Sequence, residues 1–291
     1  MLTALMEQMV NGAMMGMIYV LVALGMVLIY GVMGVLNFAQ GMVLTAGGYV
    51  CLLVFTRLVP SYWLALLLAV VTLAATGLLL ERLVFRRLRG NVQMQIVASL
   101  GLILVIQNGL VALFGASGLQ MRVGPADTLL RLGPLTFTMQ HVLIIGVVTA
   151  AVGVLFGFLR FTRLGTALRA TSQNPEAARV VGIDPDRIYL LTFAIACGLA
   201  GLGGALLGPL YLVYPQMGEL PLLKALAAIV LGGMASVPGA VVGGLAIGIV
   251  EAVSTLFIAT DYRDMVVFLV LVAALLLRPQ GLFGVRVRGE A

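Results

Sequence analysis

The sequence has very little charge and almost no histidine. Charged residues make up 10% of the 291 residues, and histidine occurs once, at His141. A soluble domain carries about 25% charged residues, so this composition excludes an ordinary soluble fold. A catalytic zinc site or a nucleophilic triad is hard to build with one histidine, and we therefore expect neither an enzyme nor a bound metal.

Cysteine is scarce as well. Cys51 and Cys197 both fall inside apolar stretches, which is typical of small core residues and not of a disulfide or a metal pair. Residues 1–8 contain no basic side chain, and the apolar sequence that follows has no small-residue cleavage site. These features do not fit a cleavable signal peptide.

Apolar sequence dominates instead. Hydrophobic residues make up 62% of the chain, and 36 residues are glycine. Most of the apolar stretches approach or exceed the about 20 helical residues that cross a bilayer; they are 9–31, 33–56, 61–80, 93–114, 140–160, 188–213, 222–234, 239–258 and 265–277. We predict an all-α fold: one polytopic transmembrane helical bundle over residues 1–291, in which glycines serve close helix packing and broken or re-entrant helices.

The basic residues predict the orientation of this bundle. Twelve lie in three connections that we assign to the cytoplasm, namely Arg82, Arg86, Arg87, Arg89, Arg160, Arg163, Arg169, Arg179, Arg187, Arg278, Arg286 and Arg288. The alternate connections hold five: Arg57, Arg122, Arg131, Lys224 and Arg263. We therefore expect the N-terminus outside and the C-terminus in the cytoplasm, which requires an odd number of crossings. Nine result if 222–234 and 239–258 both cross, and seven if they form a re-entrant hairpin.

Two interruptions of the apolar pattern lie at membrane depth. The first is the run from Asn37 to Gly41, and the second runs from Leu231 to Ala240 and is rich in glycine and proline. Non-helical backbone at that depth occurs only where protein or a water-filled cavity covers it, and paired breaks can mark a transport route. The alternative is a tight helix crossing made by small residues. Both interpretations stay open for the first break, and packing is favoured for the second.

Polar residues inside the apolar stretches are further candidates for a route. Gln107 and Glu251 lie late in the fourth and eighth stretches, and such groups tend to face a cavity or the bundle interior. Gln107 could instead bridge helices, and Glu251 could reach the membrane interface. The candidate route residues are Asn37, Phe38, Gln40, Gly41, Gln107, Gly232, Gly233 and Glu251. The sequence has no dense array of intramembrane acids, which argues against an ion-driven relay.

The longest charged interval is the segment of residues 162–187. Asn174 is a good N-cap, Pro175 fits the first helical position, and Gly182 stands where a left-handed residue ends a helix. These signals predict a helix of about two turns over 175–181, and Asp184 begins the next helix. A helix so short needs something to pack against. Two partners are possible for its apolar residues, which are Ala177, Ala178, Val180 and Val181. They lie on the chain's own bundle or on lipid, which physics alone slightly favours, or they fit a groove on another protein.

Motifs along nearly the whole chain resemble the inner-membrane permease subunits of branched-chain amino-acid ABC importers, the LivH/LivM type, and the shorter LivH member most. The resemblance rests on the order and spacing of 36–41 (LNFAQG), 81–89 (ERLVFRRLR), 98–102 (ASLGL), 162–170 (TRLGTALRA), 177–183 (AARVVGI), 217–218 (MG), 224–225 (KA), 230–233 (VLGG), 243–244 (GG), Glu251 and 278–284 (RPQGLFG).

The resemblance implies that residues 162–187 form a cytoplasmic coupling segment whose short helix seats in a cleft of a separate ATPase. The residues expected to couple are Arg163, Gly165, Arg169, Asn174, Glu176, Ala177, Ala178, Arg179, Gly182 and Ile183. It also implies two ATPase subunits, a second permease chain, a periplasmic solute-binding protein and a bacterial inner membrane. ATP and Mg would be bound by the ATPases, because this chain has no G-x-x-x-x-G-K-[ST] loop, and no cofactor is expected here.

The chain departs from the family pattern at the first break. The family usually reads Asn-Phe-Ala-His-Gly-Glu, whereas Gln40 and Met42 stand here for the His and the Glu. The implied cargo is a branched-chain or other hydrophobic amino acid, and urea, a short amide or an aromatic acid stays an alternative. A secondary transporter or channel that needs no ATPase is the rival class. A connection over 115–140 could contact an outside protein or merely cap the bundle.

Overall fold

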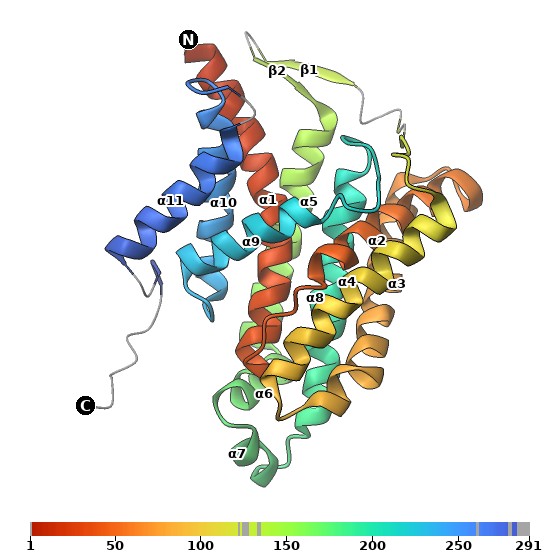
Figure 1. The fold of residues 1–291 in the computed structure, drawn as a ribbon, viewed down its shortest axis with the longest axis vertical. Coiled ribbons are helices and arrows are strands. Elements are labelled where there is room, and N and C mark those ends of the chain that lie inside the picture. The colour runs from red at the N-terminus through yellow and green to blue at the C-terminus, as the bar shows by residue number, and fades with distance from the viewer. Residues whose placement is uncertain are drawn as a thin grey trace.

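The computed structural model describes residues 2–121, 123, 128–132, 135–259, 262–278 and 281–283, and these are almost entirely helical. The helices are α1 (Leu2–Met33), α2 (Gln40–Leu53), α3 (Tyr62–Leu83), α4 (Val92–Phe114), α5 (Met139–Phe161), α6 (Arg163–Gln173), α7 (Pro175–Val180), α8 (Pro185–Leu207), α9 (Glu219–Gly232), α10 (Val237–Ser254) and α11 (Arg263–Leu277) (Figure 1). A π-helical turn, η1 (Val54–Leu58), follows α2, and a 3-10 turn, η2 (Phe85–Leu88), follows α3. Strands β1 (Leu129–Leu132) and β2 (Leu135–Thr138) form a small antiparallel hairpin with Leu129 opposite Thr138.

The expected polytopic helical membrane fold is confirmed. Within the described residues, seven helices are long and apolar enough to cross a membrane: 3–33, 40–58, 62–88, 92–114, 139–161, 185–207 and 237–254. Helices α9 and α11 have 14 and 15 residues, which corresponds to only about 21 to 23 Å at 1.5 Å per residue. These seven candidates are not the seven crossings of the expected alternative, because they include α10 but not the stretch 265–277. Arg122, Arg286 and Arg288, which were used in the orientation argument, lie outside the described residues, as do positions 279, 280 and 284 of the 278–284 motif.

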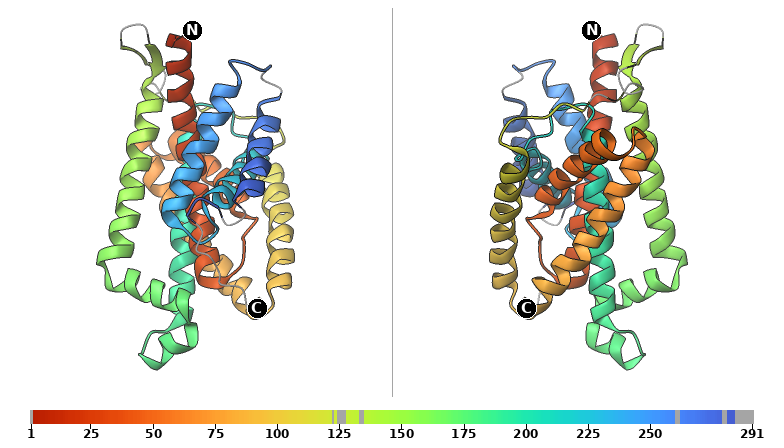
Figure 2. Two further views of the ribbon diagram at one scale, coloured as in Figure 1. Left: turned by 90° about the vertical axis from the view of Figure 1, so that its left-hand side faces the viewer. Right: turned by 90° about the vertical axis from the view of Figure 1, so that its right-hand side faces the viewer.

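Helix α1 forms the centre of the bundle. Its most apolar window is 83% buried by the rest of the chain, whereas the corresponding window of α4 is only 11% buried. Figure 2 shows α4 and α5 on opposite flanks of the molecule, with α1 between them. Large apolar side chains on these flanks, such as Val105 and Val154, are exposed. The flanks therefore face lipid or another membrane protein.

Glycines allow the central helices to touch at the backbone. Gly12 and Gly16 of α1 meet Gly248 and Gly244 of α10, and a Cβ at Gly12 would lie 2.7 Å from the Gly248 oxygen. This is the small-xxx-small spacing of close membrane helix pairs on both partners. Helix α8 packs on α2 in the same way, because a Cβ at Gly204 would overlap the Leu44 carbonyl oxygen.

We expect Gly204→Ala to destabilise the bundle strongly. The added methyl group has backbone for its nearest neighbour, so α2 and α8 must separate, at a cost of about 1–3 kcal/mol or more. The matched control is Gly146→Ala in α5, where a Cβ meets nothing within 4 Å and helix propensity favours alanine by about 1 kcal/mol. Thermal unfolding in detergent measures both, and equal midpoints would contradict the packing argument.

The first predicted break is present between α1 and α2. Gly34 ends α1 with φ +70°, and α2 begins at Gln40, whose side chain donates from Nε2 to the Ala196 carbonyl at 2.7 Å. Ala196 lies near the middle of α8, and Gln40 also sits against Gly25 in α1. Helix α2 therefore starts partway through the bundle and not at its end, as a broken span does.

The second predicted break is a tight hairpin between α9 and α10. Gly233 has φ +108°, and Gly232 packs directly on the backbone of Gly239. The backbone N–H groups of Leu282 and Phe283 donate to the carbonyls of Leu231 at 2.8 Å and Gly232 at 3.0 Å. The expected close packing of small residues is found here, and a returning C-terminal segment satisfies the last carbonyls of α9.

Candidate functional sites

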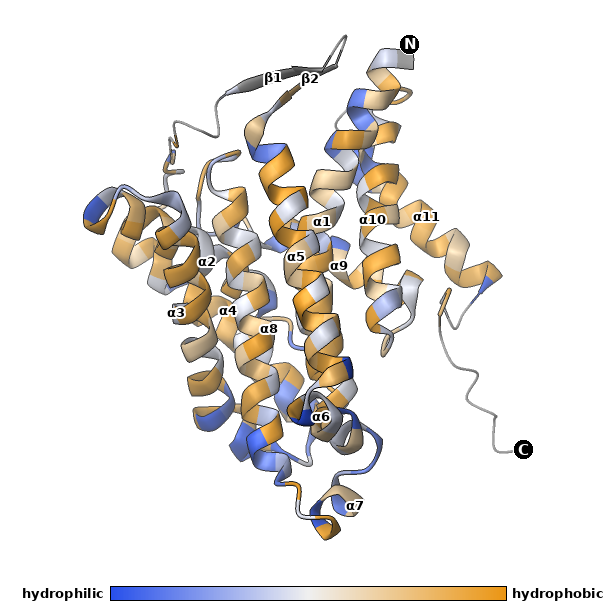
Figure 3. Ribbon diagram, turned by 180° about the vertical axis from the view of Figure 1, so that it is seen from behind, coloured by the Kyte–Doolittle hydropathy of each residue, from blue (hydrophilic) through white to orange (hydrophobic). Residues whose placement is uncertain are grey.

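The two ends of the molecule differ in charge. Figure 1 shows α6 and α7 at the end opposite the N-terminus of α1. Figure 3 shows hydrophilic residues gathered at this α6–α7 end and hydrophobic residues along the helices. The arginines of the α3–α4 connection belong to the same end, because Arg86 and Arg89 contact Asp186 at the start of α8. Most of the arginines that predicted the cytoplasmic side therefore lie around the coupling segment.

The coupling segment has the local geometry that its sequence predicts. The Asn174 side-chain oxygen accepts from the backbone N–H groups of Glu176 at 2.9 Å and Ala177 at 3.0 Å. Gly182 has φ +84°. Its N–H donates to the Arg179 carbonyl, and the Ile183 N–H donates to the Ala178 carbonyl, both at 3.0 Å. This is a Schellman ending, so α7 is closed at both ends by its own residues and stops at Val180, one residue before the predicted limit.

The surface of α7 carries an exposed apolar tip. Val180 and Val181 are 88% and 74% exposed, whereas Ala178 is buried against the chain itself. Ala178 thus anchors the short helix, and the two valines project from it. Two adjacent exposed valines thus form a small apolar patch at the extremity of a charged surface, and we treat this patch as a candidate interaction site.

The other predicted coupling residues surround this tip or support it. Gly165 is buried where α6 turns tightly against Leu159 of α5, Ile183 is half-buried, and the rest are exposed: Arg163, Arg169, Asn174, Glu176, Ala177, Arg179 and Gly182. The structure therefore gathers the predicted set into one protruding unit, α6–α7.

An arginine clamp ties the start of α8, which follows this unit, to the end of α3 and the connection after it. Asp186, in the first turn of α8, pairs with Arg86 at 3.0 Å and with Arg89. Arg89 also pairs with Glu81, which is fully buried, and its guanidinium lies 4.4 Å from the ring centre of Tyr189. Sequence reasoning noted the 81–89 motif but not its partners, because Asp186 lies about a hundred residues away and no local pattern connects the two.

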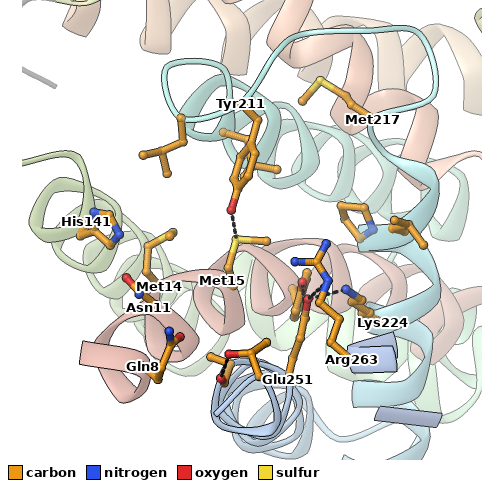
Figure 4. Close-up of a pocket in the computed structure, with 18 of the residues that line it drawn as sticks. Gln8, Asn11, Met14, Met15, His141, Tyr211, Met217, Lys224, Glu251 and Arg263 are labelled. Carbon is orange, nitrogen blue, oxygen red and sulfur yellow. Dashed lines mark hydrogen bonds and ion pairs between the residues drawn. The ribbon is translucent and has the colours of Figure 1, made fainter. Parts of the chain in front are cut away.

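A cavity of about 430 Å³ opens near the N-terminal end of α1. We call it the Glu251 cavity, and Figure 4 shows side chains from α1, α9, α10, α11 and the α8–α9 connection around it. Its walls combine apolar groups, such as Met14, Leu207 and Met217, with the charged groups of Lys224, Glu251 and Arg263. A cavity of this size, mostly apolar and with a few polar groups on one wall, is typical of a small-molecule site.

The charged wall is an ion-pair network. The Lys224 Nζ lies 2.6 Å from Glu251 Oε1 and 2.8 Å from Asp264 Oδ1. The Tyr19 hydroxyl donates to Glu251 Oε2 at 2.7 Å. Lys224 and Glu251 are 2% and 5% exposed, so two opposite charges compensate each other inside the bundle, as buried charges must.

This network corrects two sequence-based expectations. Lys224 was counted among the basic residues of an outside connection, but it lies within α9 and is buried. Glu251 does not reach the membrane interface, because Lys224 and Tyr19 hold it inside. Removing Lys224 from the outside count leaves four basic residues there against twelve, which makes the charge asymmetry larger.

Tyr211 crosses the Glu251 cavity. It comes from the α8–α9 connection, and its hydroxyl donates to the Met15 sulfur of α1 at 3.7 Å (Figure 4). Partial burial raises the pKa of the Tyr211 phenol, while nearby Arg263 acts in the opposite direction. The phenol is therefore protonated at neutral pH and able to donate.

A second cavity, of about 1270 Å³, lies beside α6. It is bounded by α1, α5, α6 and the α9–α10 turn, and it brings together Arg169 of the coupling set and Gly233 of the route set. We call it the Gly233 cavity. Arg160 and Ser172 supply further polar groups.

The remaining route residues lie apart from both cavities. Asn37 and Gln40 are fully buried. Within the described part of the chain, Asn37 Nδ2 and Gln40 Oε1 have no hydrogen-bond partner. Gly41 packs on the backbone of Gly218, and Phe38 and Gln107 are half-buried, the latter on the outlying α4. The structure thus places the candidate route residues in several locations and not at one site.

Comparison with known proteins adds a family and several relatives. Residues 8–275 match the family described as branched-chain amino acid transport system / permease component. The high-affinity branched-chain amino acid transport system permease protein LivH of Escherichia coli is 34% identical over 96% of this chain and 95% of its own length. The permease protein BraD of Pseudomonas aeruginosa is 33% identical over 96% and 95%. The permease protein LivM of Salmonella typhimurium is 26% identical over 94% of this chain and 69% of its own. No solved structure matches the chain.

Proposed function

Because the chain belongs to the family of permease components of branched-chain amino acid transport systems, we propose that it forms half of the membrane channel of an ATP-driven importer in a bacterial inner membrane. The chain is a multi-pass membrane protein. In the proposed orientation the N-terminus and the Glu251 cavity face the outside, and α6, α7 and the C-terminus face the cytoplasm. The arginine-rich α6–α7 end supports this orientation through the positive-inside tendency.

The observation that carries the proposal is the exposed valine pair on α7. A six-residue helix has too few hydrogen bonds to be stable by itself, yet α7 is capped at both ends, anchored through Ala178 and still presents Val180 and Val181 to solvent. Such a preformed apolar tip fits a cleft on a separate ATPase subunit. Two ATPases would bind and hydrolyse ATP, and this chain would have no catalytic role.

A second permease chain and an outside solute-binding protein complete the proposed assembly. The weakly buried, apolar flanks of the bundle offer a surface for a related permease, and the LivM relative is itself named a permease of the same transport system. The translocation path would lie between the two chains. Asn37 Nδ2 and Gln40 Oε1 have no hydrogen-bond partner among the described residues. Both residues are proposed polar contacts on the path, because such buried atoms need water or a solute as partner.

The proposed cargo is a branched-chain or other hydrophobic amino acid, the substrate class that the names of LivH and BraD give for those proteins. The replacement of the family's His and Glu by Gln40 and Met42 keeps urea, a short amide or an aromatic acid as alternatives. These alternatives are distinguished by equilibrium binding of each solute to the cognate outside binding protein.

Purification and reconstitution test the proposal. A tag on this chain is expected to retain two ATPases and a related permease chain. The reconstituted complex is expected to import labelled L-leucine only with internal ATP and external binding protein. Uptake by this chain alone, driven by an ion gradient, would instead assign it to the secondary transporters.

A further inference from the structure

The Glu251 cavity contains a cation, Arg263, that makes ion pairs but no hydrogen bond within the described part of the chain. Arg263, in the first turn of α11, has a side chain that is 43% exposed, and its nearest carboxylate oxygen, Glu251 Oε1, is 3.7 Å from Nε. That separation is an ion pair but too long for a hydrogen bond. Figure 4 shows the guanidinium extending into the cavity.

The buried neighbours of Arg263 are already satisfied. Lys224 is held between Glu251 and Asp264, and Glu251 accepts from both Lys224 and Tyr19. Two cations and two carboxylates meet here, so the wall has no net charge. A ligand that carries only one charge would leave this balance disturbed, whereas a ligand with both an anionic and a cationic group would preserve it.

The opposite side of the cavity provides acceptors and apolar surface. Gln8 and Asn11 of α1 place side-chain carbonyl groups across the cavity from Arg263 (Figure 4). Between the two polar sides lie Met14, Leu207 and Met217. The volume of about 430 Å³ is within the range of about 300–1,000 Å³ for ligand pockets.

We propose that the Glu251 cavity is a binding site for a free aliphatic amino acid within this chain, with the α-carboxylate on Arg263 and the α-ammonium directed to the neighbouring Glu251, whose two oxygens can accept more hydrogen bonds than those from Lys224 and Tyr19. The aliphatic side chain packs on the methionines and Leu207. The fork of Arg263 suits a carboxylate, because its paired N–H groups match the two oxygens. Tyr211, which crosses the cavity to Met15, moves aside or covers the bound solute. This inference rests on the proposed function, since it places that function's cargo at a named site.

Cysteine protection tests the site directly. Met15→Cys introduces one reactive thiol at the cavity, while the native Cys51 and Cys197 are fully buried. In the reconstituted complex without ATP, saturating L-leucine is expected to slow labelling of this thiol by a water-soluble maleimide. 4-Methylpentanoate, which lacks the ammonium, and isoamylamine, which lacks the carboxylate, are expected to protect at concentrations about tenfold or more higher. The control is Leu58→Cys, exposed on η1, where leucine is expected to change nothing.

Two variants complete the test. Arg263→Gln, made in the Met15→Cys background, is expected to raise the leucine concentration for half-protection about tenfold or more, and Arg263→Lys to raise it less. Arg57→Gln, at an exposed arginine outside the cavity, is the matched control without effect.

The inference is overturned if leucine gives no protection, if Arg263→Gln shifts nothing, or if the two single-charge compounds protect as well as leucine. ATP-dependent leucine uptake by the unmodified complex is measured in parallel. If the unmodified complex imports leucine but leucine does not protect the Met15→Cys thiol, only the proposed site is overturned. If the unmodified complex shows no ATP-dependent uptake, the proposed function is overturned instead.

Discussion

Replacing Val180 and Val181 together by aspartate is expected to abolish ATP-dependent uptake while the permease stays folded. Both side chains are almost fully exposed, so the change costs this chain little stability, as surface substitutions usually cost within about 0.5 kcal/mol. In the proposed complex the same side chains lie buried in the ATPase cleft, where two unpaired charges cost about 2 kcal/mol each. A total of about 4 kcal/mol lowers the affinity for the ATPase roughly 1,000-fold.

Co-purification of the ATPase and uptake into proteoliposomes measure this effect. The matched control is the double change Val92→Asp and Gln93→Asp, which places the same charge on exposed positions in the first turn of α4, outside the coupling segment. It is expected to retain the ATPase. If Val180→Asp/Val181→Asp also binds the ATPase and imports solute normally, the tip of α7 is not the coupling contact.

Replacing Lys224 by methionine is expected to have the largest effect on stability. The change leaves the buried Glu251 without its hydrogen-bonded cation and with only the longer ion pair to Arg263, and Asp264 loses the same close partner. Removing one member of a buried ion pair costs about 3–5 kcal/mol, a large share of the about 5–15 kcal/mol that stabilises a typical domain. Thermal unfolding of the purified permease in detergent is the measurement.

A compensating variant separates charge from packing. Adding Glu251→Gln to Lys224→Met removes the unpaired carboxylate but keeps an oxygen that can accept from Tyr19. The double variant is therefore expected to recover at least half of the lost stability. If the double variant instead loses as much stability as the two single changes together, the ion pair is not what holds α9 to α10. The packing of the lysine stem is then responsible.

The local structure of residues 174–184 was predictable because its signals are local. Asn174, Pro175 and Gly182 fix the start and end of α7 through hydrogen bonds to residues within a few positions. Long apolar runs likewise identify membrane helices without knowledge of the fold. In each case the physical cause lies within the segment itself.

The Glu251 cavity was not predictable for the opposite reason. Lys224 and Glu251 lie 27 residues apart on different helices. In the sequence, nothing distinguishes Lys224 from the other charged residues that flank apolar stretches. Asp186 and Arg89 are separated by 97 residues. Only the packing of α3 on α8, and of α9 on α10, creates these pairs. The number of crossings could not be predicted for a related reason. A helix as short as α9 is stabilised by the helices packed around it, so the length of its apolar stretch does not indicate whether it crosses the membrane.

Helix α8 joins the two ends of this chain mechanically. Its first turn holds Asp186 in the arginine clamp beside α7, and its last residue, Leu207, lines the Glu251 cavity. The 23 residues between them form one uninterrupted rod of about 34 Å. A movement of the valine tip would reach α8 through the short connection 181–184 and would then pass along one continuous helix to its far end. In that arrangement, nucleotide hydrolysis at the cytoplasmic face would change the size of the Glu251 cavity near the outer face through the movement of one helix, α8.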